Sequence, residues 1–286
     1  MKKYFNNKQI ALSAVVLIAV ILIAVLSLSV SMPTVAYAYE AGEIYYAGSG
    51  TFTKETESFS YATKTTESYS INPSYPEYYN CNDSLQNTCA NVAGANIIGY
   101  YDRFYDNLIP DYEAGILRND FYIYFPMGYY GAKKQAVIDE LYQRMQTNVS
   151  NAGSTQAQYK NGLSSYVQSK NLSISFSGVM TNGSFDLEKA KAQFKNGNPL
   201  SLYLSGYSFT MVTDSGSTVM WDKFLYNDNH IAIAYGYEKV SYFDASGKVI
   251  RTETYLKVAT GFGSVSGVYI VNKYGALNDA EAVHIA

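Results

Sequence analysis

Two kinds of hydrophobic periodicity divide this chain, and their order constrains its fold. Apolar side chains recur at helical spacing in four segments. These run from Asn87 to a point before Ile109, from Lys134 to Met145, from Thr155 to Ser169 and from Asp186 to Phe194. Strand-like alternation dominates the C-terminal part, in Leu200–Leu204, His230–Tyr242, Val249–Ala259 and Gly267–Asn272. A short strand-like segment, Leu172–Phe176, lies among the helices. Because helices precede most strands, we expect an α+β fold with an N-terminal helical half, a C-terminal antiparallel sheet and a cleft between them.

The N-terminus carries the pattern of a secretory signal. Three lysines precede an apolar stretch from about Ile10 to Val30, and small residues follow at Ala36 and Ala38. This order predicts a signal peptide over residues 1–38 that is cleaved after Ala38. The apolar stretch is also long enough to cross a bilayer, so a retained membrane anchor is the alternative.

Length and composition limit the class of protein. A chain of 286 residues with 48% hydrophobic and 16% charged residues indicates a globular protein with one main domain. Residues 39–76 are rich in Tyr, Ser and Thr, and we interpret them as a pro-segment, an edge strand or a linker. Pro73 and Pro76 mark the boundary, so the main domain spans residues 77–286. The formal net charge of -3 offers no basic field for phosphates, and we expect no nucleic acid partner.

One thiol occupies a position that favours reactivity. Cys89 begins the first helical segment directly after Asn87 and Thr88, which are both good N-cap residues. A thiol attacks carbonyl groups as a thiolate, and the positive end of a helix dipole favours that negative sulfur. The unpaired amides of the first turn can also face a tetrahedral oxyanion. The sequence therefore predicts that Cys89 is a nucleophile.

Only two histidines are available as a base for this thiol. His284 lies within the last few residues. His230 follows Asn227-Asp228-Asn229 and opens an apolar strand, which would hold its imidazole at the sheet edge and point it into the cleft. A thiol on a helix and an imidazole on a strand are the parts of a cysteine peptidase, and a structural histidine at a strand start is the alternative.

A second cysteine leaves another interpretation open. In an exported protein an even number of cysteines usually indicates a disulfide, and Cys81 and Cys89 could form one. A single short bridge would do little for a domain of this size. The alternative is that Cys89 stays reduced and reactive while Cys81 is a bystander in the preceding loop.

These features resemble the papain-like superfamily of cysteine peptidases, and within it the bacterial branch of bacteriocin-leader-processing peptidases and the streptopain group. The resemblance covers about Asn80 to the C-terminus. It is carried by Asn87-Thr88-Cys89-Ala90 with its helix, by the helix-Gly-Asn-Pro-strand unit from Asp186 to Leu204, and by His230 before Ala232-Ile233-Ala234-Tyr235-Gly236-Tyr237. It implies a papain-like two-part fold and peptide hydrolysis by Cys89 and His230 without a cofactor.

The resemblance also implies an amide donor for the oxyanion. The family usually carries a Gln about six residues before the nucleophile, where this chain has Asp83. Asn82, one residue earlier, is the candidate donor, and Gln86 lies much closer to Cys89.

A third catalytic residue that orients the histidine is expected from the same resemblance. In the family it is an Asn or Asp, and the register puts it at Ala259 or Thr260, neither of which carries an amide or a carboxylate. Asn272 is the candidate in its place, with Asn278 and Asp279 as further options. Alternatively, Asn272 only opens the turn after the strand.

We therefore expect a secreted or cell-surface cysteine peptidase that acts as a monomer on peptide or protein substrates. Membrane contact is expected only if the N-terminal anchor is retained. The sequence holds no Cys and His set for zinc and no carboxylate cluster for calcium. Two alternatives remain open: a relative that transfers the acyl group to an amine and so crosslinks, and an inactive papain-like binding or adhesion module, which the missing Asn at Ala259 favours.

Overall fold

The computed structural model describes residues 45–46, 52–71, 75–112, 115–118, 121–124, 132–262 and 267–286. The predicted signal peptide over residues 1–38, its cleavage site after Ala38 and the alternative membrane anchor lie outside these residues. Within the described ranges, no helix has both the length and the apolar character that a membrane crossing requires.

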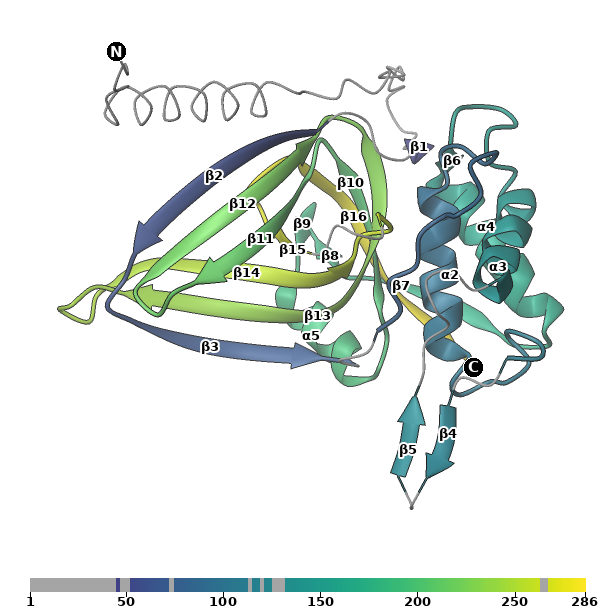
Figure 1. Ribbon diagram of the computed structural model, residues 1–286, viewed down its shortest axis with the longest axis horizontal. Helices are drawn as coiled ribbons and strands as arrows, with labels where there is room; N and C mark the ends of the chain where they lie inside the picture. Colours follow the sequence, from purple (N-terminus) through teal and green to yellow (C-terminus); the bar gives the residue numbers. More distant parts are fainter. Residues whose placement is uncertain are drawn as a thin grey trace, which may run out of the picture. The chain divides into compact units, whose positions relative to one another are not determined.

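One antiparallel sheet of ten strands organises the described residues (Figure 1). Nine strands lie in the order β2-β12-β11-β15-β14-β13-β10-β16-β7, and β3 pairs with β13. Strand β13 is central, because it pairs with β10 through its first half, with β3 through its second half and with β14 along its other edge. The strands are β2 (Phe52–Ser60), β3 (Thr63–Ser70), β7 (Ile174–Gly178), β10 (Leu200–Ser205), β11 (Ser208–Asp214), β12 (Thr218–Tyr226), β13 (Asn229–Phe243), β14 (Val249–Ala259), β15 (Val268–Ile270) and β16 (Ala276–Ile285).

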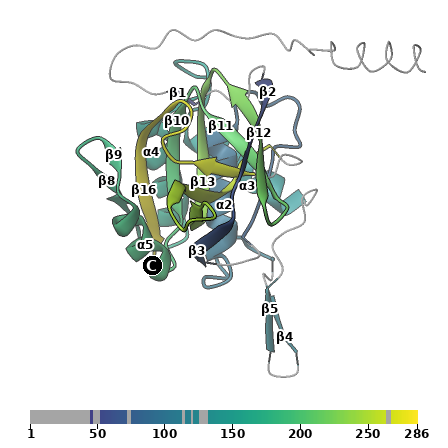
Figure 2. The ribbon, with the colours of Figure 1, turned by 90° about the vertical axis from the view of Figure 1, so that its left-hand side faces the viewer.

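Four helices and three short strand pairs complete the described part of the chain. Helix α2 is buried over its whole length and contacts α3, α4 and β13 (Figure 1). Helix α5 contacts β13 and β3, and the short pair β8 and β9 lies beside β16 (Figure 2). The helices are α2 (Cys89–Tyr101), α3 (Ala132–Arg144), α4 (Gln156–Ser169) and α5 (Leu187–Lys195). The pairs are β1 (Tyr45–Tyr46) with β6 (Ser154–Thr155), β4 (Gly115–Arg118) with β5 (Phe121–Tyr124), and β8 (Met180–Thr181) with β9 (Ser184–Phe185).

Strand β13 separates two hydrophobic clusters. Ile231 and Ile233 belong to the cluster that contains α2. Ala232 and Ala234 belong to the cluster that contains Phe194 of α5. Because successive side chains of a strand point to opposite faces, α2 and α5 cover opposite faces of β13. The start of β13, where the predicted base lies, is therefore enclosed on both faces.

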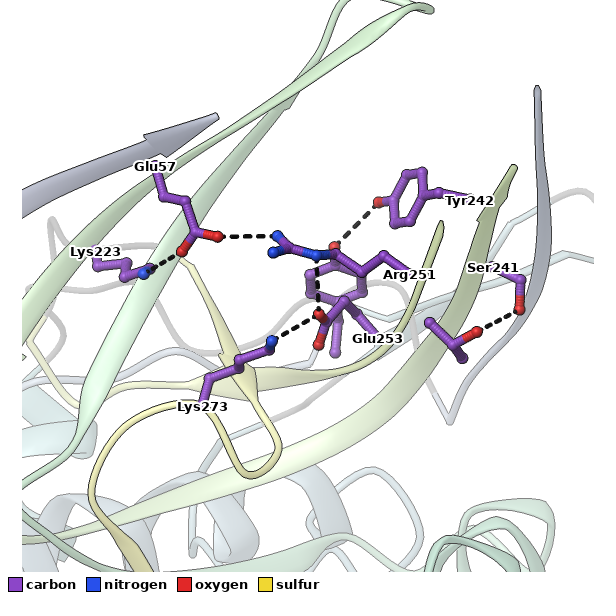
Figure 3. A network of polar contacts seen from close by, with 9 residues as sticks. Glu57, Lys223, Ser241, Tyr242, Arg251, Glu253 and Lys273 are labelled. Atoms are coloured by element: carbon purple, nitrogen blue, oxygen red, sulfur yellow. Dashed lines mark hydrogen bonds and ion pairs between the residues drawn. The ribbon is translucent and has the colours of Figure 1, made fainter. Parts of the chain in front are cut away.

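Ionic and aromatic contacts hold the polar strand β2 in the sheet. Glu57 accepts hydrogen bonds from Lys223 at 2.5 Å and from Arg251 at 2.9 Å (Figure 3). The ring of Phe59 packs edge-on against Trp221, with centroids 5.4 Å apart. A single exposed ion pair contributes little, but these charges form a connected network between β2, β12 and β14.

The predicted fold class was wrong. The sequence predicted an α+β, papain-like two-part fold with a helical half followed by a sheet, whereas the described residues form one large antiparallel sheet with only four helices. Strands β2 and β3 come before the first of these helices, and β7 lies between two of them, so the described residues form no separate helical half. The physical reason is that the mostly exposed, polar β2 and β3 join the sheet through backbone pairing, which apolar alternation does not signal.

Many individual elements were nevertheless predicted. All four helices and strands β7, β10, β13, β14 and β15 match expected segments, although α2 ends at Tyr101, earlier than predicted. Gly162 does not interrupt α4. Its missing side chain lets α4 approach the end of α3, because a Cβ there would lie 2.8 Å from the backbone nitrogen of Met145. Strands β11, β12 and β16 were not predicted.

Candidate functional site

Cys89 is the first residue of α2 and is 6% exposed. Thr88, one of the two residues predicted as N-cap, is the N-cap of α2. Its carbonyl oxygen accepts the first helical hydrogen bond from the Val92 amide at 2.9 Å. The Thr88 side chain makes no capping bond. The first turn, which the structure describes completely, holds no acidic residue. Nothing on this turn therefore opposes a negative charge on the sulfur.

His230 is the second residue of β13 and pairs with Leu204 of β10. Its side chain is fully buried among aromatic rings. The imidazole packs nearly parallel to Tyr207 and to Phe262, with centroids 5.0 and 4.6 Å away, and edge-on to Phe209 at 5.8 Å. The strand and these rings hold the imidazole in one orientation.

One hydrogen bond sets the tautomer of the imidazole. Nε2 of His230 lies 2.7 Å from the carbonyl oxygen of Thr260. A carbonyl oxygen only accepts, so in the neutral ring Nε2 carries the hydrogen and Nδ1 carries the lone pair. Nδ1 is buried and has no hydrogen-bond partner among the described residues. The arrangement presents an unused basic nitrogen inside the protein.

Burial makes the charged imidazole unfavourable. Desolvation lowers the pKa of His230 from its ordinary value of 6.5 to about 4, and the bond to Thr260 offsets this only in part. The imidazole is therefore neutral at neutral pH. A resting pair of imidazolium and thiolate is therefore disfavoured in this environment.

Cys89 belongs to the hydrophobic cluster on the α2 side of β13, whereas Tyr207 belongs to the cluster on the α5 side. Strand alternation puts the imidazole on the α5 face of β13, whereas α2 covers the other face. Tyr207 packs against the imidazole. Its pKa is raised well above the ordinary value, mainly by desolvation, with a smaller contribution from the nearby Asp228 carboxylate. In the described structure neither ring nitrogen of His230 bonds to the sulfur, because Nε2 bonds to the Thr260 carbonyl and Nδ1 has no partner among the described residues.

A tight turn links the helix of the thiol to the imidazole. Thr260 follows β14, and Gly261 adopts a φ of 81°, the left-handed region that favours glycine. A Cβ on Gly261 would lie 3.5 Å from Cγ1 of Val92, one helical turn beyond Cys89. The same turn presents the Thr260 carbonyl to the imidazole and places Phe262 against it. The position of α2 and the orientation of the base are therefore coupled.

The expected third residue does not contact the imidazole. Asn272 is exposed and has a φ of 62° in the turn after β15. Nε2 of His230 bonds to the Thr260 carbonyl and Nδ1 has no partner among the described residues, so Asn272 orients neither nitrogen. The imidazole is instead oriented by the backbone carbonyl of Thr260. Thr260 is one of the two positions at which the resemblance to papain-like peptidases predicts the orienting residue. The sequence could not reveal it, because every residue has a carbonyl.

The remaining candidates have local partners. The Asn82 side-chain oxygen accepts hydrogen bonds from the amide and the hydroxyl of Ser84, at 3.1 and 2.6 Å, which makes Asn82 a turn residue ahead of α2. Cys81 and Cys89 do not form a disulfide. Three other candidates bond elsewhere: Asn278 to Ser205, Asp279 to Gln156, and His284 to Asn198.

Sequence reasoning missed Tyr207. Its side chain is fully buried, and its hydroxyl has no hydrogen-bond partner among the described residues. It lies just before β11, a strand that the sequence did not predict, in a chain with 30 tyrosines. No local pattern distinguished it from the others.

The described residues contain no group of three or more His, Cys, Asp or Glu side chains arranged to hold a metal ion. No family model matches the sequence, and no curated protein or solved structure matches the chain. The geometry of the site is therefore the basis on which a function can be assigned.

The buried imidazole predicts a pH dependence of stability. As pH falls below 6.5 the unfolded chain protonates His230, but the folded protein does so only near pH 4, so wild-type stability is lost between these values. We expect the wild type to lose about 2 kcal/mol more unfolding free energy than His230→Gln between pH 7 and pH 5. Urea unfolding at both pH values measures this, and His284→Gln separates the contribution of the second histidine. Parallel losses in wild type and His230→Gln would contradict the burial of a neutral imidazole.

Proposed function

We propose that the protein is an exported cysteine peptidase in which Cys89 is the nucleophile and His230 is the general base. One observation carries the proposal: Nε2 of His230 is engaged with the Thr260 carbonyl, and the buried Nδ1 lone pair has no partner among the described residues. Leaving such an acceptor without a partner costs about 1–3 kcal/mol. A catalytic role is one of the explanations for a buried polar atom without a partner.

The proposed reaction begins when a bound peptide brings the Cys89 sulfur within hydrogen-bond distance of Nδ1. Catalytic hydrogen bonds are often long in unliganded proteins and tighten only when substrate binds. Nδ1 takes the thiol proton as the sulfur attacks the peptide carbonyl, and the imidazolium then gives this proton to the leaving amine. Water, activated by the same nitrogen, releases the acyl group from Cys89.

A charged intermediate of this kind needs hydrogen-bond donors. The amides at the start of α2 supply one set. The Tyr207 hydroxyl supplies another, because it is buried, has no partner among the described residues and belongs to a ring that packs against His230. Its raised pKa keeps it protonated, so it stays a donor at neutral pH. Asn82 is less suited, because its side-chain oxygen is engaged in the turn at Ser84.

A second function, a binding module without catalysis, is favoured by one observation. His230 is fully buried among aromatic rings and makes no bond to Cys89, as expected for a histidine that only fills a core. In that case the thiol and the imidazole would act independently, and replacing either would leave ligand binding intact. Activity measurements separate the two functions.

We expect Cys89→Ala and His230→Gln each to reduce peptide hydrolysis by at least about 10³-fold in reducing buffer. The matched control is Cys81→Ser, which removes the other thiol and should retain wild-type hydrolysis. The assay follows cleavage of an unstructured casein substrate by mass spectrometry. Hydrolysis that survives Cys89→Ala would refute the assignment, and a labelled amine in the same assay detects transfer in place of hydrolysis.

Replacing Tyr207 with Phe removes the hydroxyl and keeps the ring against His230. We expect kcat/KM to fall about 10²-fold, mostly through kcat, because the donor acts on the charged intermediate. Tyr226→Phe is the matched control, since Tyr226 is also buried and stacks on Tyr207 with centroids 4.9 Å apart. Equal kinetics for the two variants would exclude Tyr207 as the donor.

A further inference from the structure

A second thiol lies beside a buried ammonium group, outside the site described above. Lys134 donates hydrogen bonds through Nζ to the Tyr79 carbonyl oxygen at 2.6 Å and to Sγ of Cys81 at 3.0 Å. Lys134 is fully buried, whereas Cys81 is exposed. The backbone amide of Cys81 also donates to the Gln135 side chain at 2.8 Å. These bonds attach the loop ahead of α2 to the start of α3.

The charge of this ammonium has to be compensated. No carboxylate of the described residues forms an ion pair with Lys134, whose contacts are the Tyr79 carbonyl, the Tyr79 ring at 4.7 Å and the Cys81 sulfur. Lys134 also lies in the first turn of α3, where the helix dipole disfavours a cation and no acidic residue is present. A buried charge is costly unless it is paired. Cys81 is the contacting group that can become an anion.

We propose that Cys81 is a thiol modification site, in which the Lys134 ammonium stabilises the thiolate and the exposed sulfur exchanges with low-molecular-weight disulfides. The thiolate sulfur attacks one sulfur of the disulfide. A bond forms between Sγ and that sulfur, the original S–S bond breaks, and its electron pair leaves on the departing thiolate, which takes a proton from water. Cys81 is oxidised to a mixed disulfide and the departing thiol is the reduced product.

The same charge pair makes the modification reversible. A mixed disulfide is neutral, so Lys134 is left buried without its anion. Reduction restores the pair, and thiolates stabilised in this way are good leaving groups in thiol–disulfide exchange. Because the loop of Cys81 leads directly into α2, modification changes the anchoring of the segment that carries Cys89. No sequence pattern indicated this role, since Lys134 is distant from Cys81 along the chain.

The test uses the full chain with Cys89→Ser, so that Cys81 is the only thiol. Its reaction with 2,2′-dipyridyl disulfide at pH 6 is followed through the released thiopyridone. We expect Lys134→Met, which keeps the stem and removes the charge, to react at least about tenfold more slowly. Lys134→Arg keeps the charge and should retain most of the rate.

Equal rates for Lys134→Met and its parent would overturn the proposal. If Lys134→Met does not fold, the decisive comparison is between the native Cys89→Ser protein and the same protein unfolded in urea at pH 6. The native thiol must then react faster than the unfolded one, although folding restricts access to it. A native rate equal to or below the unfolded rate would contradict activation by Lys134.

Discussion

The hydrogen bond between Nε2 of His230 and the Thr260 carbonyl is the interaction on which the candidate site depends. It fixes which nitrogen holds the proton and leaves the other as a base, and it does so without a charged residue. Because no carboxylate neutralises the imidazolium, burial dominates and the pKa falls to about 4. A neutral base, a thiol at a helix start and a buried tyrosine hydroxyl are then the chemical groups that this part of the protein offers.

The architecture explains how the imidazole is held. Strand β13 has α2 on one face and α5 on the other, and the turn after β14 lies against its start through the bond from His230 to Thr260. A Cβ at Gly261 of that turn would be in ordinary contact with Val92 of α2, and the turn holds the imidazole through Thr260 and covers it with Phe262. A movement of α2 relative to the sheet would therefore change both the position of the thiol and the orientation of the base.

The sequence predicted the parts of the molecule that depend on local pattern. Amphipathic spacing located four helices, and apolar alternation located the central strand and its neighbour β14. The thiol at the start of α2 and the histidine at the start of β13 were found for the same reason. Strands β2 and β3 carry mainly exposed polar side chains, so no apolar alternation predicted them. Their positions depend on backbone pairing and on contacts such as those of Glu57 with Lys223 and Arg251.

The remaining site residues could not be predicted because their roles depend on three-dimensional contacts. Thr260 acts through a carbonyl that every residue has, and Tyr207 differs from other tyrosines only in what surrounds its ring. Asn272 was predicted as the residue that orients the histidine from the resemblance to papain-like peptidases. In the structure it is exposed and has a left-handed backbone conformation in a turn. The prediction of the fold class was wrong for a similar reason, since it was based on the order of helices and strands along the chain and not on which strands pair.

The tautomer and charge of His230 can be measured by ¹⁵N NMR of the histidine rings across pH. The chain has only two histidines, so His284→Gln assigns the His230 resonances. We predict a protonated Nε2 and an unprotonated Nδ1 that keep their chemical shifts from pH 8 down to pH 5. A hydrogen on Nδ1, or a ring that becomes fully charged by pH 6, would contradict the proposed role of the imidazole as a neutral buried base.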